Sequence, residues 1–293
     1  MCGNINKKIC FIILYHNIEF NGRTGTDILK NYLNNIKSDI GDAYDIDYFL
    51  VGDNVKDADY IFKYPDVYEN MGYMLNRFGG FRYFYTGRSI YPILDFYKNH
   101  AQYDKYFIIE YDTYYTGSFK EFFDNINING DIDVIIPKPE YGVKNWYWYR
   151  FGGYVGEDKK IDNIYSYFER QNFVMAHGLL QVYMLSNDAM KYINDAIYYL
   201  YNIDYKIVNN IHYEALVPII ILNNKKLINH IGITNPLKFG FFEDIYKEPF
   251  YYLDWYDPGK ISEYLKKENA LLHPVKLHLL HDKIFLENKN RKY

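Results

Sequence analysis

A short apolar run, residues 106–109, leads directly into the acidic tripeptide Glu110-Tyr111-Asp112. Such a run predicts a buried strand, so the chain leaves the core where two acids stand one residue apart. Residues i and i+2 of an extended chain point the same way, which directs both carboxylates to one place. In open α/β sheets, ligands bind just beyond the carboxyl ends of the strands. The sequence therefore indicates a candidate site at this strand end.

Two carboxylates that face one point repel each other. A hard divalent cation with oxygen ligands would relieve this repulsion. The tripeptide fits equally well a strand that ends in solvated turn acids. The choice between a metal site and such a turn depends on what else the fold brings to the two acids.

Strand-like runs alternate with helical segments in the first part of the chain. Alternation of this kind predicts an α/β fold with a mostly parallel central sheet and helices on both faces. No linker-like or repetitive tract interrupts the chain, so we expect a single domain. Strands are predicted at 8–15, 46–51, 60–63, 106–109 and 133–136, and helices at 26–36, 68–78, 89–99 and 118–125.

The second half of the chain is less regular. Strands are predicted at 179–185 and 226–231, and helices at 187–201 and 212–222. Residues 141–154 hold a dense run of aromatic side chains between glycines. This segment fits either a wall that stacks on sugar rings or a loop that folds back onto the core.

Charge and hydropathy exclude several classes of protein. The formal net charge of −4 gives no basis for a nucleic-acid partner. No run is long enough to span a bilayer, so we expect a cytoplasmic protein, with peripheral attachment to a membrane left open. The apolar run at 9–15 follows two lysines but precedes no small-residue cleavage site, so it is interpreted as the first strand.

Two segments resemble a known family. Residues 108–119, with the pattern E-Y-D-x-x-x-x-G after a strand, resemble the metal-binding segment of nucleotide-sugar glycosyltransferases of the GT-A fold. His273-Pro274-Val275-Lys276 resembles a C-terminal segment of one poorly characterised group among them. The resemblance implies a GT-A-like fold over residues 1–293. Residues 1–137 would form the nucleotide-binding half, and 138–293 an acceptor half with the C-terminal metal and phosphate segment.

The same resemblance implies a metal site. Asp112 would bind a divalent cation, Mn²⁺ or Mg²⁺, with help from Glu110, His273 or His278. Asp112 is favoured over Glu110 because the family more usually has Asp at the first acidic position. The cation would bridge the phosphates of a nucleotide sugar, with a UDP-sugar preferred, and stabilise the charge that develops on the leaving group.

Further residues could bind phosphate or move a proton. Arg82, Arg88 and Lys276 are candidates for phosphate contacts, although a solvated helix face is the simpler explanation for either arginine. Glu214, at the start of a helix in the acceptor half, is the candidate base that deprotonates the acceptor hydroxyl. A helix N-terminal acid stabilised by the dipole is the alternative for Glu214, and retaining chemistry stays open.

Together these features favour a metal-dependent glycosyltransferase of the hexosyl- or N-acetylhexosaminyl-transferase type, with a glycan or another hydroxyl compound as acceptor. A sugar nucleotidyltransferase is an alternative, but that class usually has a glycine-rich basic loop after the first strand. Here residues 16–20 read HNIEF. A non-catalytic glycan-binding or assembly protein is the second alternative, and the intact acid pair argues against it.

Overall fold

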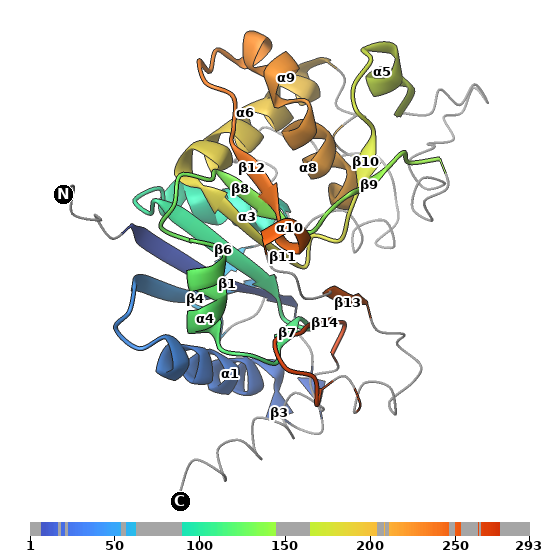
Figure 1. Cartoon of the computed structure of the whole chain (residues 1–293). Helices are drawn as coiled ribbons and strands as arrows, with labels where there is room; N and C mark the ends of the chain where they lie inside the picture. Colours follow the sequence, from blue (N-terminus) through green and yellow to red (C-terminus); the bar gives the residue numbers. More distant parts are fainter. Residues whose placement is uncertain are drawn as a thin grey trace, which may run out of the picture.

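The central feature of the computed structural model is a seven-stranded sheet with the order β12-β8-β11-β6-β1-β4-β5 (Figure 1). Every strand in it runs parallel to the others except β11, which is antiparallel to both of its neighbours. The strands are β1 (Lys8–His16), β4 (Asp45–Asp53), β5 (Tyr60–Phe62), β6 (Lys105–Glu110), β8 (Val134–Ile136), β11 (Val182–Ser186) and β12 (Phe239–Phe241). The structure describes residues 7–16, 19–20, 23–53, 57–62, 90–144, 165–203, 208, 211–245, 250–252, 263 and 265–275.

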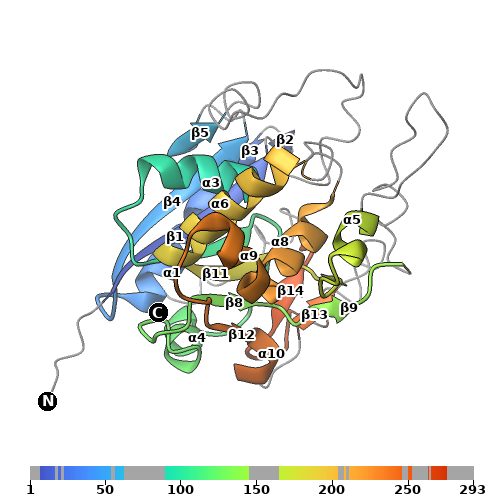
Figure 2. The ribbon, with the colours of Figure 1, turned by 90° about the horizontal axis from the view of Figure 1, so that it is seen from above.

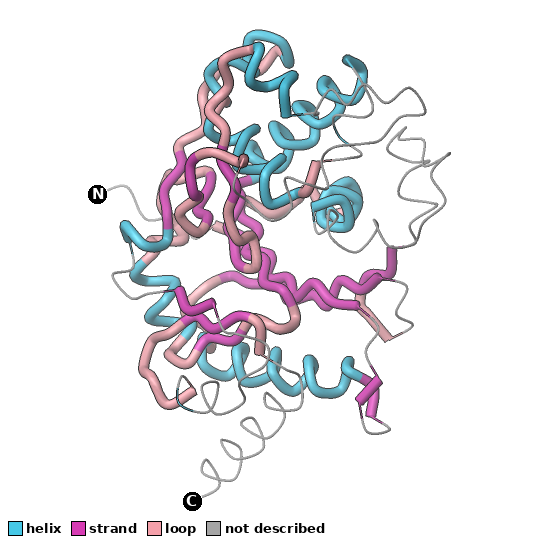
Figure 3. The backbone as a smooth tube through the Cα atoms, turned by 90° about the vertical axis from the view of Figure 1, so that its right-hand side faces the viewer, coloured by secondary structure: helices cyan, strands magenta, loops and turns pink. Residues whose placement is uncertain are grey.

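Helices cover both faces of this sheet. One face packs against α1 (Gly25–Ile40) and α4 (Phe119–Asn125). The other packs against α3 (Ile90–Asn99), α6 (Asn187–Ile203) and α8 (Tyr213–Leu222), with α9 (Asn224–Ile231) against α6 and α8 (Figure 2). Figure 3 shows helices on both sides of the strands. The predicted α/β class, with a mostly parallel sheet between helices, is confirmed.

The interior of strand β1, residues 9–15, is apolar because both of its faces are buried. Side chains at alternate positions point to opposite faces, and both faces are covered. Phe11 and its odd-numbered neighbours pack with α1 and α4, while Ile12 and its even-numbered neighbours pack with α3 and α6. A strand buried on both faces has no position for a polar side chain until it ends. The basic residues of β1, Lys8 and His16, are its first and last residues.

Smaller elements surround the main sheet. The described residues form three short sheets. These are β7 (Tyr114–Tyr115) with β13 (Phe250–Tyr252) and β14 (Leu271–His273), β9 (Glu140–Tyr141) with β10 (Ala176–His177), and β2 (Glu19–Phe20) with β3 (Arg23–Thr24). The short helices are α5 (Tyr165–Arg170) and α10 (Phe242–Ile245). Among the helices of the described residues, none has the length and apolarity that a bilayer span requires.

One predicted element is wrong. Residues 226–231 were expected to form a strand, but they belong to helix α9. Leu227, Ile228 and Ile231 recur at a spacing of three and four, which is the helical period, and these side chains pack against the core. Gly232 ends the helix in a left-handed conformation with φ of 72°. The helix expected at 68–78 lies outside the described residues.

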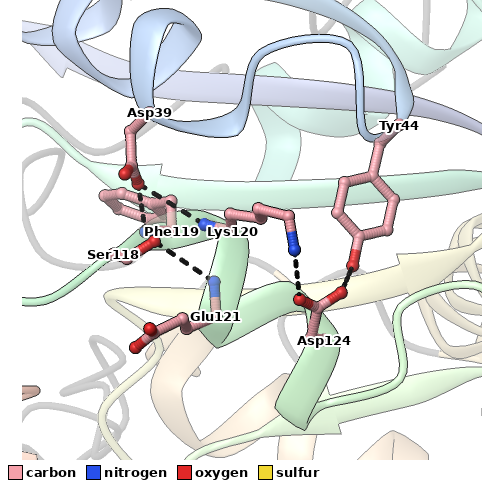
Figure 4. Close-up of polar contacts among 7 residues, drawn as sticks. All are labelled: Asp39, Tyr44, Ser118, Phe119, Lys120, Glu121 and Asp124. Atoms are coloured by element: carbon pink, nitrogen blue, oxygen red, sulfur yellow. Dashed lines mark hydrogen bonds and ion pairs between the residues drawn. The ribbon is translucent and has the colours of Figure 1, made fainter.

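The backbone N–H groups at the N-terminus of α4 donate hydrogen bonds to the helix's own cap residue and to a carboxylate of α1 (Figure 4). Ser118 accepts from the backbone N–H of Glu121 at 3.3 Å, as an N-cap residue does. The carboxylate of Asp39, on α1, accepts from the N–H groups of Phe119 at 2.5 Å and Lys120 at 3.4 Å. A carboxylate near a helix N-terminus also interacts favourably with the helix dipole. Asp39 therefore holds α1 and α4 together beneath the sheet.

We expect Asp39→Ala to lower the free energy of unfolding by about 1 kcal/mol, as loss of a helix cap usually does. Urea denaturation measures the change. Exposed Asp42, just beyond the C-terminus of α1, provides the control, because Asp42→Ala removes the same charge and no cap. Equal stabilities of the two variants would contradict the capping role of Asp39.

Candidate active site

The acidic tripeptide lies at a topological switch point of the sheet. Strand β1 pairs with β4 on one side and with β6 on the other, so the chain reverses its direction of winding at β1. Leu14 of β1 pairs with Glu110, the last residue of β6. In open α/β sheets this place, at the carboxyl ends of the strands, is where ligands bind. The location is therefore suited to a functional site.

Backbone hydrogen bonds anchor the tripeptide to the strands on both sides of β6. The N–H of Glu110 donates to the carbonyl of Gln181, and the N–H of Tyr111 donates to the carbonyl of Leu14. Asp112 follows directly in a turn and is buried, with 7% of its surface exposed. The reading of the pair as solvated turn acids is thus not supported for Asp112.

The histidine-containing segment predicted near the C-terminus returns to these acids. Strand β14 pairs antiparallel with β7, which begins two residues after Asp112. The N–H of Val275 donates to the carbonyl of Asp112 at 2.6 Å. The peptide bond between His273 and Pro274 is cis. These contacts bring His273, buried at the end of β14, next to Asp112.

Glu110, Asp112 and His273 form a cluster whose candidate ligand atoms all lie within 4.8 Å of one another. Nε2 of His273 lies 3.2 Å from Oδ1 of Asp112 and 3.6 Å from Oε2 of Glu110. Two carboxylate oxygens and an imidazole nitrogen form a donor set that suits Mn²⁺ better than Mg²⁺, which prefers oxygen alone. The residues therefore fit a divalent cation, and this is the one such cluster within the described part of the chain.

The electrostatics of His273 reflect the two acids. Burial acts to lower the pKa of His273, but the hydrogen bond and charge of Asp112, and the charges of Glu110 and Glu214, raise the pKa above its ordinary value. An imidazolium at this position compensates the paired negative charges. The cluster thus requires positive charge, which a proton or a cation can supply.

Glu214 lies in the first turn of α8 and is 6% exposed. Its Oε1 accepts a hydrogen bond from Nε2 of Gln181 at 2.8 Å, and its Oε2 lies 3.5 Å from Nδ1 of His212. Burial, followed by the charge of Glu110, raises the pKa of Glu214 to about 8. An acid stabilised chiefly by a helix dipole would have a lowered pKa. The raised value instead matches a carboxyl group that exchanges a proton near neutral pH.

Sequence reasoning missed two residues that connect these groups. Gln181 accepts the backbone N–H of Glu110 with its carbonyl and donates to Glu214 with its side chain. The hydroxyl of Tyr213 donates to Oε1 of Glu110 at 2.9 Å. A glutamine just before a strand and a tyrosine at a helix start carry no local signal of function. Only the tertiary arrangement identifies them.

The other predicted site residues lie outside the described residues. They are Arg82, Arg88, Lys276 and His278, and most of the aromatic segment at 141–154 falls there as well.

Comparisons with known proteins give similarities in structure alone. No protein-family model and no curated protein matches the chain. It is similar to a glycosyltransferase involved in the glycosylation of the major capsid of PBCV-1, with 12% identity, 94% of this chain and 99% of that chain covered, and a TM-score of 0.41. Mouse xyloside xylosyltransferase 1 in its apo form gives 8% identity, coverage of 92% and 97%, and a TM-score of 0.41. A putative glucose-1-phosphate thymidylyltransferase from Bacillus anthracis has 10% identity, with 80% of this chain and 86% of that chain covered, and a TM-score of 0.35.

The buried carboxyl of Glu214 predicts a pH-dependent effect of Glu214→Gln on stability. Since the folded-state pKa is about 8, against an ordinary value of 4.5, the folded protein binds more protons than the unfolded chain between these pH values. Wild-type stability arising from this group therefore falls as pH rises, by at most about 1.4 kcal/mol per pH unit. A glutamine at this position does not titrate, so the variant does not lose this contribution to stability as the pH rises.

Glu214→Gln should therefore gain stability relative to the wild type as the pH rises from 5 to 8. Urea denaturation of both proteins in EDTA at pH 5, 6.5 and 8 measures the difference. A difference in unfolding free energy that stays constant with pH would contradict the raised pKa.

Proposed function

We propose that this chain is a metal-dependent glycosyltransferase that moves a sugar from a nucleotide-diphosphate sugar, a UDP-sugar by preference, to a hydroxyl acceptor. The observation that carries the proposal is the convergence of Glu110, Asp112 and His273 at the switch point of the sheet. A buried carboxyl with a raised pKa, Glu214, interacts electrostatically with the same cluster. The sequence resemblance of the tripeptide segment supports the same chemistry.

In this proposal, Asp112, Glu110 and His273 hold a divalent cation, Mn²⁺ or Mg²⁺. A bound cation supplies positive charge that offsets the negative charge developing on a departing diphosphate. Glu110 and His273 end paired strands, and Asp112 lies in a turn held by the hydrogen bond from Val275, so the fold fixes the backbone positions of all three residues. Arg82, Arg88, Lys276 and His278 remain candidates for further contacts to the phosphates or the metal.

Glu214 is proposed as the base that takes the proton from the acceptor hydroxyl. A base works best when its pKa lies near the working pH, and burial raises the pKa of Glu214 to about 8. Gln181 would hold one carboxyl oxygen in place, which leaves the orientation of the group defined. This role corresponds to a single-displacement transfer that inverts the anomeric configuration, and retention in the product would count against it.

The proposed site takes residues from both halves of the chain. Residues 1–137, the proposed nucleotide-binding half, supply Glu110 and Asp112, and 138–293, the proposed acceptor half, supply Glu214 and His273. The two halves would therefore work as one domain. Its proposed location is the cytoplasm, with attachment to a membrane surface only through an acceptor or a partner.

Binding of UDP and Mn²⁺ tests the metal site. A ligand that binds only the native state stabilises it by about 2.7 kcal/mol at 100 times its dissociation constant. We expect UDP with Mn²⁺ to raise the melting temperature of the wild type, and Asp112→Asn to abolish the metal-dependent part of this shift.

Asp131→Asn is the matched control, because it removes an exposed aspartate near the amino end of β8. The acidic tripeptide lies at the opposite, carboxyl ends of the strands. A full shift in Asp112→Asn would remove Asp112 from the site. A shift with free sugars but not with UDP would favour a glycan-binding protein.

The base is tested by turnover. In a screen for slow hydrolysis of nucleotide sugars, water replaces the unknown acceptor. Glu214→Gln should lower the rate about 10²–10⁴-fold, the usual contribution of a positioned base, while the shift by UDP and Mn²⁺ persists. A rate equal to that of the wild type would exclude Glu214 as the base.

A further inference from the structure

Tyr213 contacts the candidate metal cluster from an element that contributes none of the three ligand candidates. It is the first residue of α8, and its hydroxyl donates to Oε1 of Glu110 at 2.9 Å across 103 positions of the chain. The residue is buried, so little water competes for this hydrogen bond. The hydroxyl therefore makes a defined contact with one oxygen of the acid.

The two oxygens of Glu110 have different neighbours. Oε1 accepts the hydrogen bond from Tyr213, whereas Oε2 lies 3.6 Å from Nε2 of His273. The hydrogen bond at Oε1 restricts rotation of the carboxylate. Oε2 is then directed toward the space that Glu110 shares with Asp112 and His273.

Glu110 needs such a contact more than Asp112 does. A glutamate has one more rotatable bond than an aspartate, so its carboxylate can adopt more positions. The side chain of Glu110 is also more exposed, at 17% against 9% for Asp112. Repulsion between the two acids would otherwise favour rotamers that turn Glu110 away from Asp112.

Tyr213 is itself held in place by the residue before it. Its ring stacks on the imidazole of His212, with centroids 5.0 Å apart. His212 is the N-cap of α8, and its Nδ1 accepts from the N–H of Glu214 at 3.3 Å. Burial lowers the pKa of His212 to about 3, so the ring is neutral, as an accepting Nδ1 requires.

We propose that Tyr213 is a positioning residue that fixes the carboxylate of Glu110 for cation binding. The inference rests on the proposed function in one respect, because it takes the cluster to bind a divalent cation. Residues that orient metal ligands through hydrogen bonds typically change metal affinity 10–100-fold when they are lost.

The test is a titration of the full chain with Mn²⁺ alone, followed by the electron paramagnetic resonance signal of the free ion. Tyr213→Phe keeps the ring and its stacking on His212 and removes only the hydroxyl. We expect its dissociation constant for Mn²⁺ to rise about 10-fold or more. The melting temperature of the metal-free protein checks that the variant is folded.

Tyr192→Phe is the matched control. Its buried hydroxyl donates to the carbonyl of Ile220, near the other end of α8, at 3.2 Å. Loss of this hydroxyl removes a comparable hydrogen bond to the same helix with no contact to Glu110. The affinity for Mn²⁺ should then stay at the wild-type value.

A double-mutant cycle separates positioning from a general structural effect. If Tyr213 acts through Glu110, Tyr213→Phe should change the affinity less than about twofold when Glu110→Gln is already present. An equal loss in both backgrounds would overturn the proposal. Wild-type affinity in Tyr213→Phe would overturn it too, while Mn²⁺ binding by the wild type would leave the proposed function intact. Absence of Mn²⁺ binding by the wild type would overturn both.

Discussion

The electrostatic balance at the carboxyl end of β6 is the constraint on which the site depends. Glu110 and Asp112 point to one place that is mostly shielded from water, where repulsion between carboxylates is stronger than in solution. His273 lies within 3.6 Å of both carboxylates, and their charges raise its pKa against the effect of burial. Positive charge at its centre therefore stabilises the arrangement. A proton on His273 and a divalent cation are two ways to meet the same requirement.

This requirement connects distant parts of the chain. His273, which can supply positive charge as imidazolium, lies on β14. This strand pairs with β7, and the hydrogen bond from Val275 to Asp112 holds the chain just after it at the turn. Gln181, just before β11, holds both the backbone of Glu110 and the side chain of Glu214. A complete site therefore exists only when the sheet, α8 and the segment around β14 are folded together. Its geometry is a property of the whole fold and not of one local motif.

The features that follow from local patterns could be predicted from the sequence. Strand β6 and the acid pair at its end follow from an apolar run and a period of two. The starts of α4 and α6 follow from serine caps, because Ser118 and Ser186 each accept a hydrogen bond from a backbone N–H. The strand expected in place of α9 shows the limit for short segments, because Leu227, Ile228 and Ile231 fit more than one period. The proximity of His273 to Asp112 depends on pairing across more than half the chain, which no local spacing encodes. Gln181 and Tyr213 act through tertiary hydrogen bonds, so their residue types alone gave no sign of a role.

Two glutamates near the same cluster illustrate how environment can separate roles. Glu110 meets the hydroxyl of Tyr213, a hydrogen-bond donor, and the imidazole of His273, whose pKa is raised by the neighbouring acids. Glu214 is enclosed near the start of α8, where it meets an amide and the neutral ring of His212, and burial raises its pKa to about 8. Pairs of acids whose surroundings differ in this way are typical of sites in which one group stays charged and another exchanges a proton. The difference arises from α8, because the same helix start that supplies a hydrogen bond to Glu110 buries Glu214. The different surroundings of the two glutamates thus arise from one turn of helix.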